Sequence, residues 1–171
     1  MARIEADAAV QTLDVIEQQA VRVQQEVQML FSLLSLERSD PQLHNPIELA
    51  RAAARLFERL HAATLSSVRI TASSEGGAVE VPAGPCIRAI ILCIRAFADA
   101  AQGPGRGIRE IELYVYGADD KVGVAVRCGD ASVSPLRHSL DAAADLLHPH
   151  PGAHLETDGG RVRLLMRIPA A

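Results

Sequence analysis

The stretch that decides the fold is IREIELYVYGADDKVGVAVRC, residues 108–128. Apolar residues recur at every second position in both halves, a period that predicts two half-buried strands. These residues are Ile111, Leu113, Val115, Val122, Val124 and Val126. The pair Asp119-Asp120 separates the halves and marks a turn. The stretch therefore predicts an antiparallel hairpin with one face in a core.

Strands and helices are predicted on both sides of this hairpin. Strand patterns lie at 68–71 and 78–81, helix patterns at 85–101 and 136–147, and a last hairpin turns at 158–160 and ends at Ile168. The order is strands, helix, hairpin, helix, hairpin. It predicts an antiparallel-leaning sheet covered on one face by helices, hence an α+β fold, over residues 67–171.

Residues 1–66 are predicted to form an antiparallel helical hairpin. Apolar residues recur in unbroken steps of four and three, at Ala9, Leu13, Ile16, Ala20, Val23, Val27, Leu30 and Leu34. A helix over residues 4–37 would be about 50 Å long. Asn45-Pro46-Ile47-Glu48 marks the start of a second helix, because Asn suits the N-cap and Pro the first helical position. That helix carries the same spacing at Leu49, Ala53, Leu56, Leu60 and Ala63.

One seam on each helix leaves apolar side chains uncovered on the first helix, for example Val10, Phe31 and Leu33. Two hairpins that pair into a four-helix bundle would bury them, so we expect a homodimer. The expected interface comprises Leu13, Ile16, Ala20, Val23, Val27, Leu30, Leu34, Leu56 and Leu60. The alternative is a hairpin that packs on its own C-terminal module.

Composition narrows the classes of function. The chain has 171 residues, of which 49% are hydrophobic, so wholesale disorder is excluded. The net charge of −4 and the 3% content of aromatic residues argue against nucleic-acid binding. No apolar run approaches the roughly 18 residues that span a bilayer, and the N-terminus lacks a signal-peptide pattern. We expect a cytoplasmic protein without a membrane partner, and its three cysteines suit free thiols.

The arrangement resembles the core of a bacterial sensor histidine kinase. Such kinases have a dimerising four-helix bundle that carries the phosphoacceptor His, followed by an ATP-binding domain. RVQQEVQ at 22–28 and FSLLSLE at 31–37 are similar to the first bundle helix of one kinase subfamily. LFERL at 56–60 resembles the end of that subfamily's second helix, and 152–169 resembles the closing hairpin of the ATPase-like domain.

The chain departs from the family where the family does its chemistry. The position that matches the acceptor His is Val21, which has no nucleophilic atom. Leu92 and Ala96 stand where the family has the Glu and Asn of the nucleotide-binding helix, so no oxygen ligand for Mg²⁺ is offered. The adenine-reading Asp-x-Gly-x-Gly loop falls at 128–132, where Cys128 replaces the Asp. The second glycine-rich loop and the ATP lid have no counterpart between Pro135 and Leu147.

We therefore predict a non-catalytic two-component signalling adaptor, or pseudo-histidine-kinase, that needs no cofactor and no metal. The resemblance implies that a response-regulator receiver domain docks around Val21, with Arg22, Gln24, Gln25 and Gln28 beside it. A partner histidine kinase that pairs through the seam is the other expected partner. The remaining interpretation within the family is a histidine phosphotransferase that uses an unorthodox His, such as His61 or His44.

Two further hypotheses concern small ligands. The first is a sensor that binds a small molecule in the vacated nucleotide cleft near Leu92, Ala96 and Cys128. The second is a metal site, because imidazoles suit zinc, copper or nickel. Its histidines would be His138, His148, His150 and His154, although a polar loop explains them as well.

Overall fold

The computed structural model describes residues 40–60, 66–72, 77–101, 109–118, 120–158 and 160–169. The chain divides into two units, Met1–Glu37 and Arg38–Ala171, and every described residue belongs to the second. The elements are β1 (Gln42–His44), α2 (Pro46–Leu60), β2 (Ser66–Ala72), β3 (Val79–Val81), α3 (Ala83–Ala100), β4 (Arg109–Ala118), β5 (Lys121–Cys128), α4 (Arg137–Leu147), β6 (Ala153–Asp158) and β7 (Arg161–Arg167). The first predicted helix, residues 4–37, lies outside the described residues.

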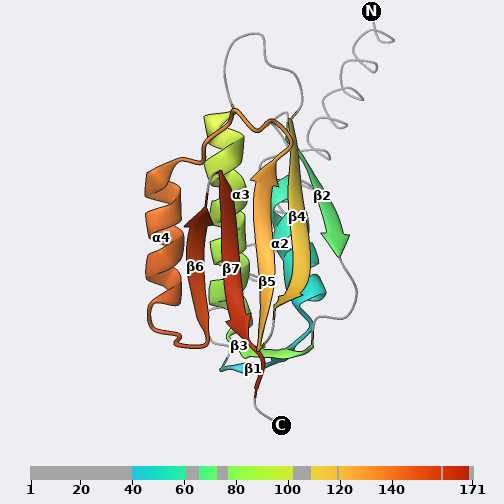
Figure 1. Cartoon of the computed structure of the whole chain (residues 1–171), viewed down its shortest axis with the longest axis vertical. Coiled ribbons are helices and arrows are strands. Elements are labelled where there is room, and N and C mark those ends of the chain that lie inside the picture. Colours follow the sequence, from blue (N-terminus) through green and yellow to red (C-terminus); the bar gives the residue numbers. More distant parts are fainter. Residues whose placement is uncertain are drawn as a thin grey trace, which may run out of the picture. The chain divides into compact units, whose positions relative to one another are not determined.

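A five-stranded sheet in the order β2-β4-β5-β7-β6 forms one layer (Figure 1). The predicted hairpin is confirmed, because β4 and β5 pair antiparallel from Ile111 opposite Cys128 to Ala118 opposite Lys121. The closing hairpin, β6 and β7, is confirmed as well. Its turn contains Gly160 with φ of +89°, a conformation that glycine adopts without strain.

Two pairings were not predicted. β2 pairs with β4 in parallel, although every other pair in this sheet is antiparallel. β1 pairs with β3 in a separate two-stranded sheet. β1 has only three residues, too few to display a period of two, and the parallel pairing joins segments that are far apart in the sequence.

The helices α2, α3 and α4 cover one face of the sheet (Figure 1), which was predicted for α3 and α4. The core lies between the two layers and contains large side chains that are less than 2% exposed. Examples are Phe57, Phe97, Ile90, Ile94, Ile111, Leu113, Leu164 and Met166. α3 is the central helix, since it contacts α2, α4 and three strands of the sheet.

α2 begins where the sequence predicted a helix start. The backbone N of Ile47 donates a hydrogen bond to Oδ1 of Asn45 over 2.9 Å, so Asn45 caps the helix. Leu49, Ala53 and Phe57 form its buried face, and α2 contacts α3, β2 and β4. α2 thus belongs to the same unit as the sheet.

The sequence predicted α2 as the second helix of a hairpin over residues 1–66, whereas its contacts among the described residues are with α3 and the sheet. The contacts divide the chain at Arg38, and the predicted domains 1–66 and 67–171 stay a prediction. An amphipathic helix shows the same apolar stripe whether it packs on a helix or on a sheet, so the stripe alone does not name its partner. The described residues do not support the helical hairpin.

No helix among the described residues is long and apolar enough to cross a membrane.

Candidate functional site

The residues that match the nucleotide-binding positions of the resembled family lie on α3 and at the end of β5. Leu92 is half-buried, Ala96 is 0% exposed and Cys128 is 7% exposed. Ala96 and Cys128 therefore present almost no surface to a ligand in this structure. The side chains of Leu92 and Ala96 contain no oxygen or nitrogen atom that would bind a cation.

The connection between β5 and α4, residues 129–136, lies directly against α3. The backbone N of Leu136 donates a hydrogen bond to the carbonyl oxygen of Ala96 over 3.1 Å. Val133 in the same connection is 5% exposed. α4 follows at once and packs along α3, with Leu140 and Leu147 buried. The chain itself thus covers α3 at Ala96.

The polar groups at the start of this connection bond to β4 and to the connection's own turn. Gly129 donates its backbone N–H to the carbonyl oxygen of Glu110 over 2.9 Å. Oδ1 of Asp130 accepts hydrogen bonds from the backbone N and from Oγ of Ser132, over 3.0 and 2.6 Å. These contacts hold the Asp130 carboxylate against its own loop, as in other Asx turns.

α3 also carries two buried thiols. Burial raises the pKa of Cys86 and of Cys93 from the ordinary value of 9.0 to about 12, because a thiolate loses its hydration there. Both groups are therefore neutral at physiological pH. Since the thiolate is the reactive form, the two cysteines serve as apolar packing.

Three of the histidines singled out in the sequence meet at a surface pocket between α4 and β6. The pocket has a volume of about 460 Å³, and His148, His150 and His154 line it. The remaining lining residues are Ala144, Leu147, Pro151, Ala153 and Leu155. Nε2 of His154 lies 3.3 Å from Oε1 of Glu156. Within the described ranges, however, no group of three or more His, Cys, Asp or Glu residues is placed to hold a metal ion.

The other predicted site residues fall into two groups. Val21, Arg22, Gln24, Gln25, Gln28 and His61 lie outside the described residues, as do the interface positions from Leu13 to Leu34. Leu56 is half-buried on α2, and Leu60 at its end is 39% exposed. His44 lies in β1, and its Nε2 atom is buried and has no hydrogen-bond partner among the described residues. A nitrogen so enclosed is a poor phosphate acceptor.

No protein-family model and no curated protein sequence matches the chain. Solved structures do. The catalytic domain of the histidine kinase ThkA superposes with a TM-score of 0.58 at 16% identity, covering 77% of this chain and 100% of that domain. The fold is that of a histidine kinase catalytic domain. The Acinetobacter baumannii histidine kinase AdeS is similar as well, with a TM-score of 0.53, 11% identity and coverage of 84% of this chain and 77% of AdeS.

A third similar structure shows ThkA in complex with the response regulator protein TrrA. It has a TM-score of 0.55 and 15% identity, and covers 89% of this chain and 49% of that one. Identities this low establish the likeness of fold. Histidine-kinase-like architecture over Arg38–Ala171 agrees with the resemblance seen in the sequence.

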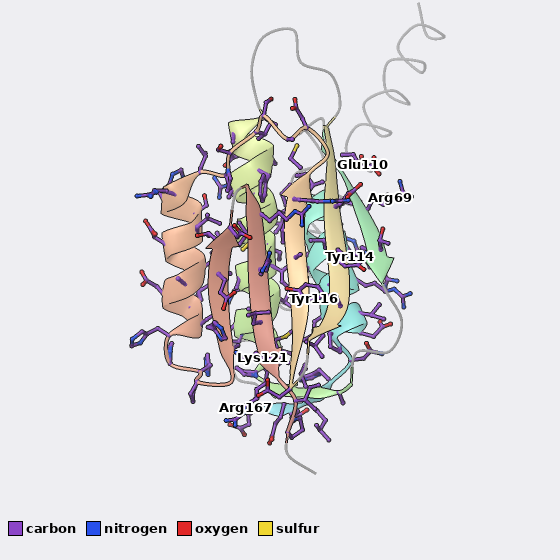
Figure 2. All side chains as sticks on the ribbon, in the orientation of Figure 1. Arg69, Glu110, Tyr114, Tyr116, Lys121 and Arg167 are labelled. Atoms are coloured by element: carbon purple, nitrogen blue, oxygen red, sulfur yellow. The ribbon has the colours of Figure 1, made fainter. Side chains whose placement is uncertain are left out.

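One surface of this histidine-kinase-like domain was not predicted from the sequence. The face of the sheet opposite the helices carries Tyr114, Tyr116, Lys121 and Arg167 (Figure 2). The alternation in β4 already placed Tyr114 on the outward face. The pairing of β5 with β7, which brings Lys121 opposite Arg167, has no signal in the sequence.

Proposed function

We propose that the chain is a non-catalytic two-component signalling adaptor, a pseudo-histidine-kinase that binds a response-regulator receiver domain or a partner kinase. In this proposal the histidine-kinase fold is kept as a scaffold. ATP binding and phosphoryl transfer from a bundle His are lost. The function of such a protein is to hold or to block a signalling partner.

The proposal rests on the side chains that α3 carries at two positions, Leu92 and Ala96. A kinase needs oxygen ligands at these positions to hold Mg²⁺, and alkyl side chains supply none. The hydrogen bond from Leu136 to the Ala96 carbonyl holds the chain's own backbone against this part of α3. The residues present do not fit Mg²⁺ and ATP.

The loop after β5 supports the same conclusion. Cys128 stands at the position of the adenine-reading Asp and is 7% exposed. The nearby carboxylate, Asp130, bonds to Ser132 within its own turn. Adenine recognition needs a carboxylate that accepts from the exocyclic amine, and a thiol is a poor substitute for it.

A receiver domain is the proposed partner because of the resemblance in residues 22–37. In the resembled family, receivers dock on the bundle beside the acceptor His. Transferred to this chain, the docking surface consists of Val21, Arg22, Gln24, Gln25 and Gln28. That ThkA, a structural neighbour, was solved with a response regulator adds support.

The proposed homodimer rests on the apolar seam from Leu13 to Leu34. Its unbroken steps of four and three are typical of helices that pair along their whole length. On α2, half-buried Leu56 and partly exposed Leu60 leave apolar surface that a second copy would cover. The alternative is that the first helix covers apolar surface of its own chain.

The first experiment is calorimetry with ATP and Mg²⁺ on full-length protein whose mass in solution has been measured by light scattering. We expect a dimeric mass and no heat of binding. Micromolar ATP binding would refute the non-catalytic assignment of Leu92, Ala96 and Cys128. A monomeric mass would refute the proposed dimer but would not affect the conclusion drawn from the ATP titration.

A second experiment restores the missing acceptor with Val21→His. The variant and the parent chain are mixed with receiver domains of the source organism, each labelled as the aspartyl phosphate. If receivers dock around position 21, the phosphoryl group moves from the Asp oxygen to the new imidazole nitrogen in the variant. Glu26→His is the control and should remain unlabelled, because five residues further along the predicted helix it lies about 140° around the axis from position 21. Label on the parent chain would instead favour an unorthodox phosphotransferase.

A further inference from the structure

The face of the sheet opposite the helices bears an aromatic centre. Tyr114 and Tyr116 of β4 stack on each other, with ring centroids 5.9 Å apart and an angle of 17° between the planes. Their cross-strand partners on β5 are Ala125 and Gly123, two of the smallest residues. Because these partners are small, the rings have room to lie across β5, as Figure 2 shows for Tyr116.

The fit between Tyr116 and Gly123 is close. A Cβ atom built at Gly123 would lie 2.6 Å from Cε1 and from Oη of Tyr116. The next strand, β7, brings Leu165 opposite Gly123, and Leu165 is only 8% exposed. Tyr114, by contrast, is 38% exposed. The centre of this face is therefore an apolar platform with one tyrosine open to solvent.

Carboxylates on this face are matched by bases at most positions. Glu110 pairs with Arg69 over 3.5 Å, and Asp158 pairs with Arg163 over 3.0 Å. Glu112 pairs with Arg127, and Glu156 lies 3.3 Å from His154. The Arg69–Glu110 pair lies at one end of the face in Figure 2. Each of these four carboxylates has a basic partner within the chain.

Lys121 and Arg167 break this pattern at the other end of the face (Figure 2). The strand register places them directly opposite each other on β5 and β7, one row from Tyr116 and Leu165. Neither forms an ion pair with any described residue. Like charges directly opposite in a sheet cost stability, so this pair lowers the stability of the isolated domain.

We propose that Tyr114, Tyr116, Lys121 and Arg167 form a docking surface for a protein segment that places a carboxylate next to an apolar or aromatic side chain. The carboxylate would bind between Lys121 and Arg167, where two positive charges favour charge-assisted hydrogen bonds. The apolar side chain would cover Tyr114 and Tyr116. We name these four residues the tyrosine–basic surface.

A protein segment fits this surface better than a nucleic acid does. The whole chain has a net charge of −4, which repels a polyanion. The face also carries Glu110, Glu112, Glu156 and Asp158, which a phosphate backbone crossing the sheet would approach. Among the described residues, Lys121 and Arg167 put two unpaired positive charges side by side at one end, whereas Arg161 at the other end lies opposite Asp158. Two adjacent positive charges suit a short acidic segment. This inference does not depend on the proposed receiver docking at Val21.

The test uses the full-length chain and fluorescence anisotropy. The probe is a short fluorescein-labelled peptide in which glutamate alternates with leucine and phenylalanine, and a second peptide has glutamine for glutamate. Arg167→Glu is the test variant. Arg161→Glu is the matched control, because it makes the same charge change on the same face of β7, at the opposite end of the strand.

We expect Arg167→Glu to weaken binding of the glutamate peptide about tenfold and Arg161→Glu to change it less than about twofold. Tyr114→Ser should weaken both peptides, since it removes apolar contact. Equal loss in Arg161→Glu and Arg167→Glu, or no binding by the parent chain, would overturn the proposal. Tighter binding of a labelled oligothymidylate, dependent on the same residues, would also overturn it and favour a nucleic-acid platform.

Lys121→Glu supplies a second, independent readout. It replaces the like-charge pair by a pair of opposite sign across from Arg167, so the melting temperature should rise by about 1–3 °C. The same variant should weaken binding of the glutamate peptide about tenfold. A gain in stability with unchanged binding would contradict a docking role for Lys121.

Discussion

The backbone amide of Leu136 donates a hydrogen bond to the carbonyl oxygen of Ala96, with 3.1 Å between the two atoms. Ala96 lies in α3, and its carbonyl already faces the next turn of that helix. The added bond ties the connection before α4 to the position where the resembled kinases have the Asn of their nucleotide-binding helix. A ligand that used the Ala96 carbonyl would have to displace Leu136.

This contact predicts that the kinase residue cannot be restored at position 96. Ala96 is 0% exposed, so Ala96→Asn forces extra atoms into a packed site and should cost about 1–3 kcal/mol of unfolding free energy. It should also leave ATP binding undetectable by calorimetry. Urea unfolding of the full-length chain measures the cost. Ala142→Asn, at an exposed position of α4, is the control and should cost about 0.5 kcal/mol. Equal costs would show that Ala96 is not confined.

The packing of α2 leads to a prediction about two of its residues. Phe57 is 0% exposed, so Phe57→Ala should lower the unfolding free energy by about 3–5 kcal/mol, and the milder Phe57→Leu by about 1 kcal/mol. Leu60 is 39% exposed, so Leu60→Ala should cost less than about 1 kcal/mol within the domain.

Leu60 is also part of the proposed dimer interface, whereas Phe57 is not. Dimer affinity and domain stability should therefore respond differently to the two substitutions. Light scattering over a dilution series should show that Leu60→Ala raises the dimer Kd about tenfold, while Phe57→Leu leaves it unchanged. If both variants leave the Kd unchanged, Leu60 lies outside the interface, and the seam from Leu13 to Leu34 alone carries the proposed dimer.

Local patterns were the part of the fold that could be predicted. The β4–β5 and β6–β7 hairpins, α3 and α4 follow from periods of two and of 3.6 residues within short segments. The helix over α2 was also predicted, together with its Asn45 cap. Its packing partner was not, because the same apolar stripe suits a bundle and a sheet. The parallel pairing of β2 with β4 depends on tertiary contacts that no local period encodes.

Some features of the candidate sites could likewise be predicted from the sequence, and others could not. The sequence alone shows that the side chains of Leu92 and Ala96 contain no oxygen or nitrogen atom that would bind a cation. The closure of Ala96 by Leu136 depends on the path of an irregular connection, which has no periodic signal. Lys121 meets Arg167 because β5 pairs with β7, two strands that no short hairpin joins. Such long-range register becomes visible only in the fold.

The two buried thiols on α3 predict a pH dependence of stability. In the folded chain the pKa of Cys86 and of Cys93 is about 12, whereas an exposed thiol in the unfolded chain ionises near 9.0. Between these values the unfolded state releases protons that the folded state keeps, so stability falls as the pH rises from about 9 to 12. Each thiol contributes a slope of up to about 1.4 kcal/mol per pH unit.

Urea unfolding at pH 8, 9 and 10 measures this slope. The control is the double variant Cys86→Ala, Cys93→Ala, which lacks both thiols and should lose stability less steeply. The comparison uses slopes, so the small cavities that alanine leaves do not affect it. Parallel curves for the two proteins would show that the thiols are not buried as described. Iodoacetamide at pH 8 should correspondingly label Cys86 and Cys93 in urea and spare them in buffer.

The contact between Tyr116 and Gly123 predicts that replacing Gly123 by alanine lowers stability, the reverse of the usual effect within a strand. A glycine within a strand is usually less stable than alanine by about 0.5–1 kcal/mol. At Gly123 a Cβ atom would strike the Tyr116 ring and push it off Tyr114. Gly123→Ala should therefore cost about 1 kcal/mol of unfolding free energy. Gly117→Ala on β4 is the control, since nothing lies within 4 Å of its added Cβ, and it should be neutral or stabilising.

A double-mutant cycle with Tyr116→Ser identifies the ring as the cause. In the serine background the space above Gly123 is free, so Gly123→Ala should become neutral or stabilising there. The resulting coupling energy should be about 1–1.5 kcal/mol by urea unfolding. An unchanged cost in both backgrounds would place the strain in the backbone of β5 instead. Because Tyr116 also belongs to the tyrosine–basic surface, Gly123→Ala should weaken binding of the glutamate peptide while Gly117→Ala leaves it intact, which links the packing of the ring to the surface it forms.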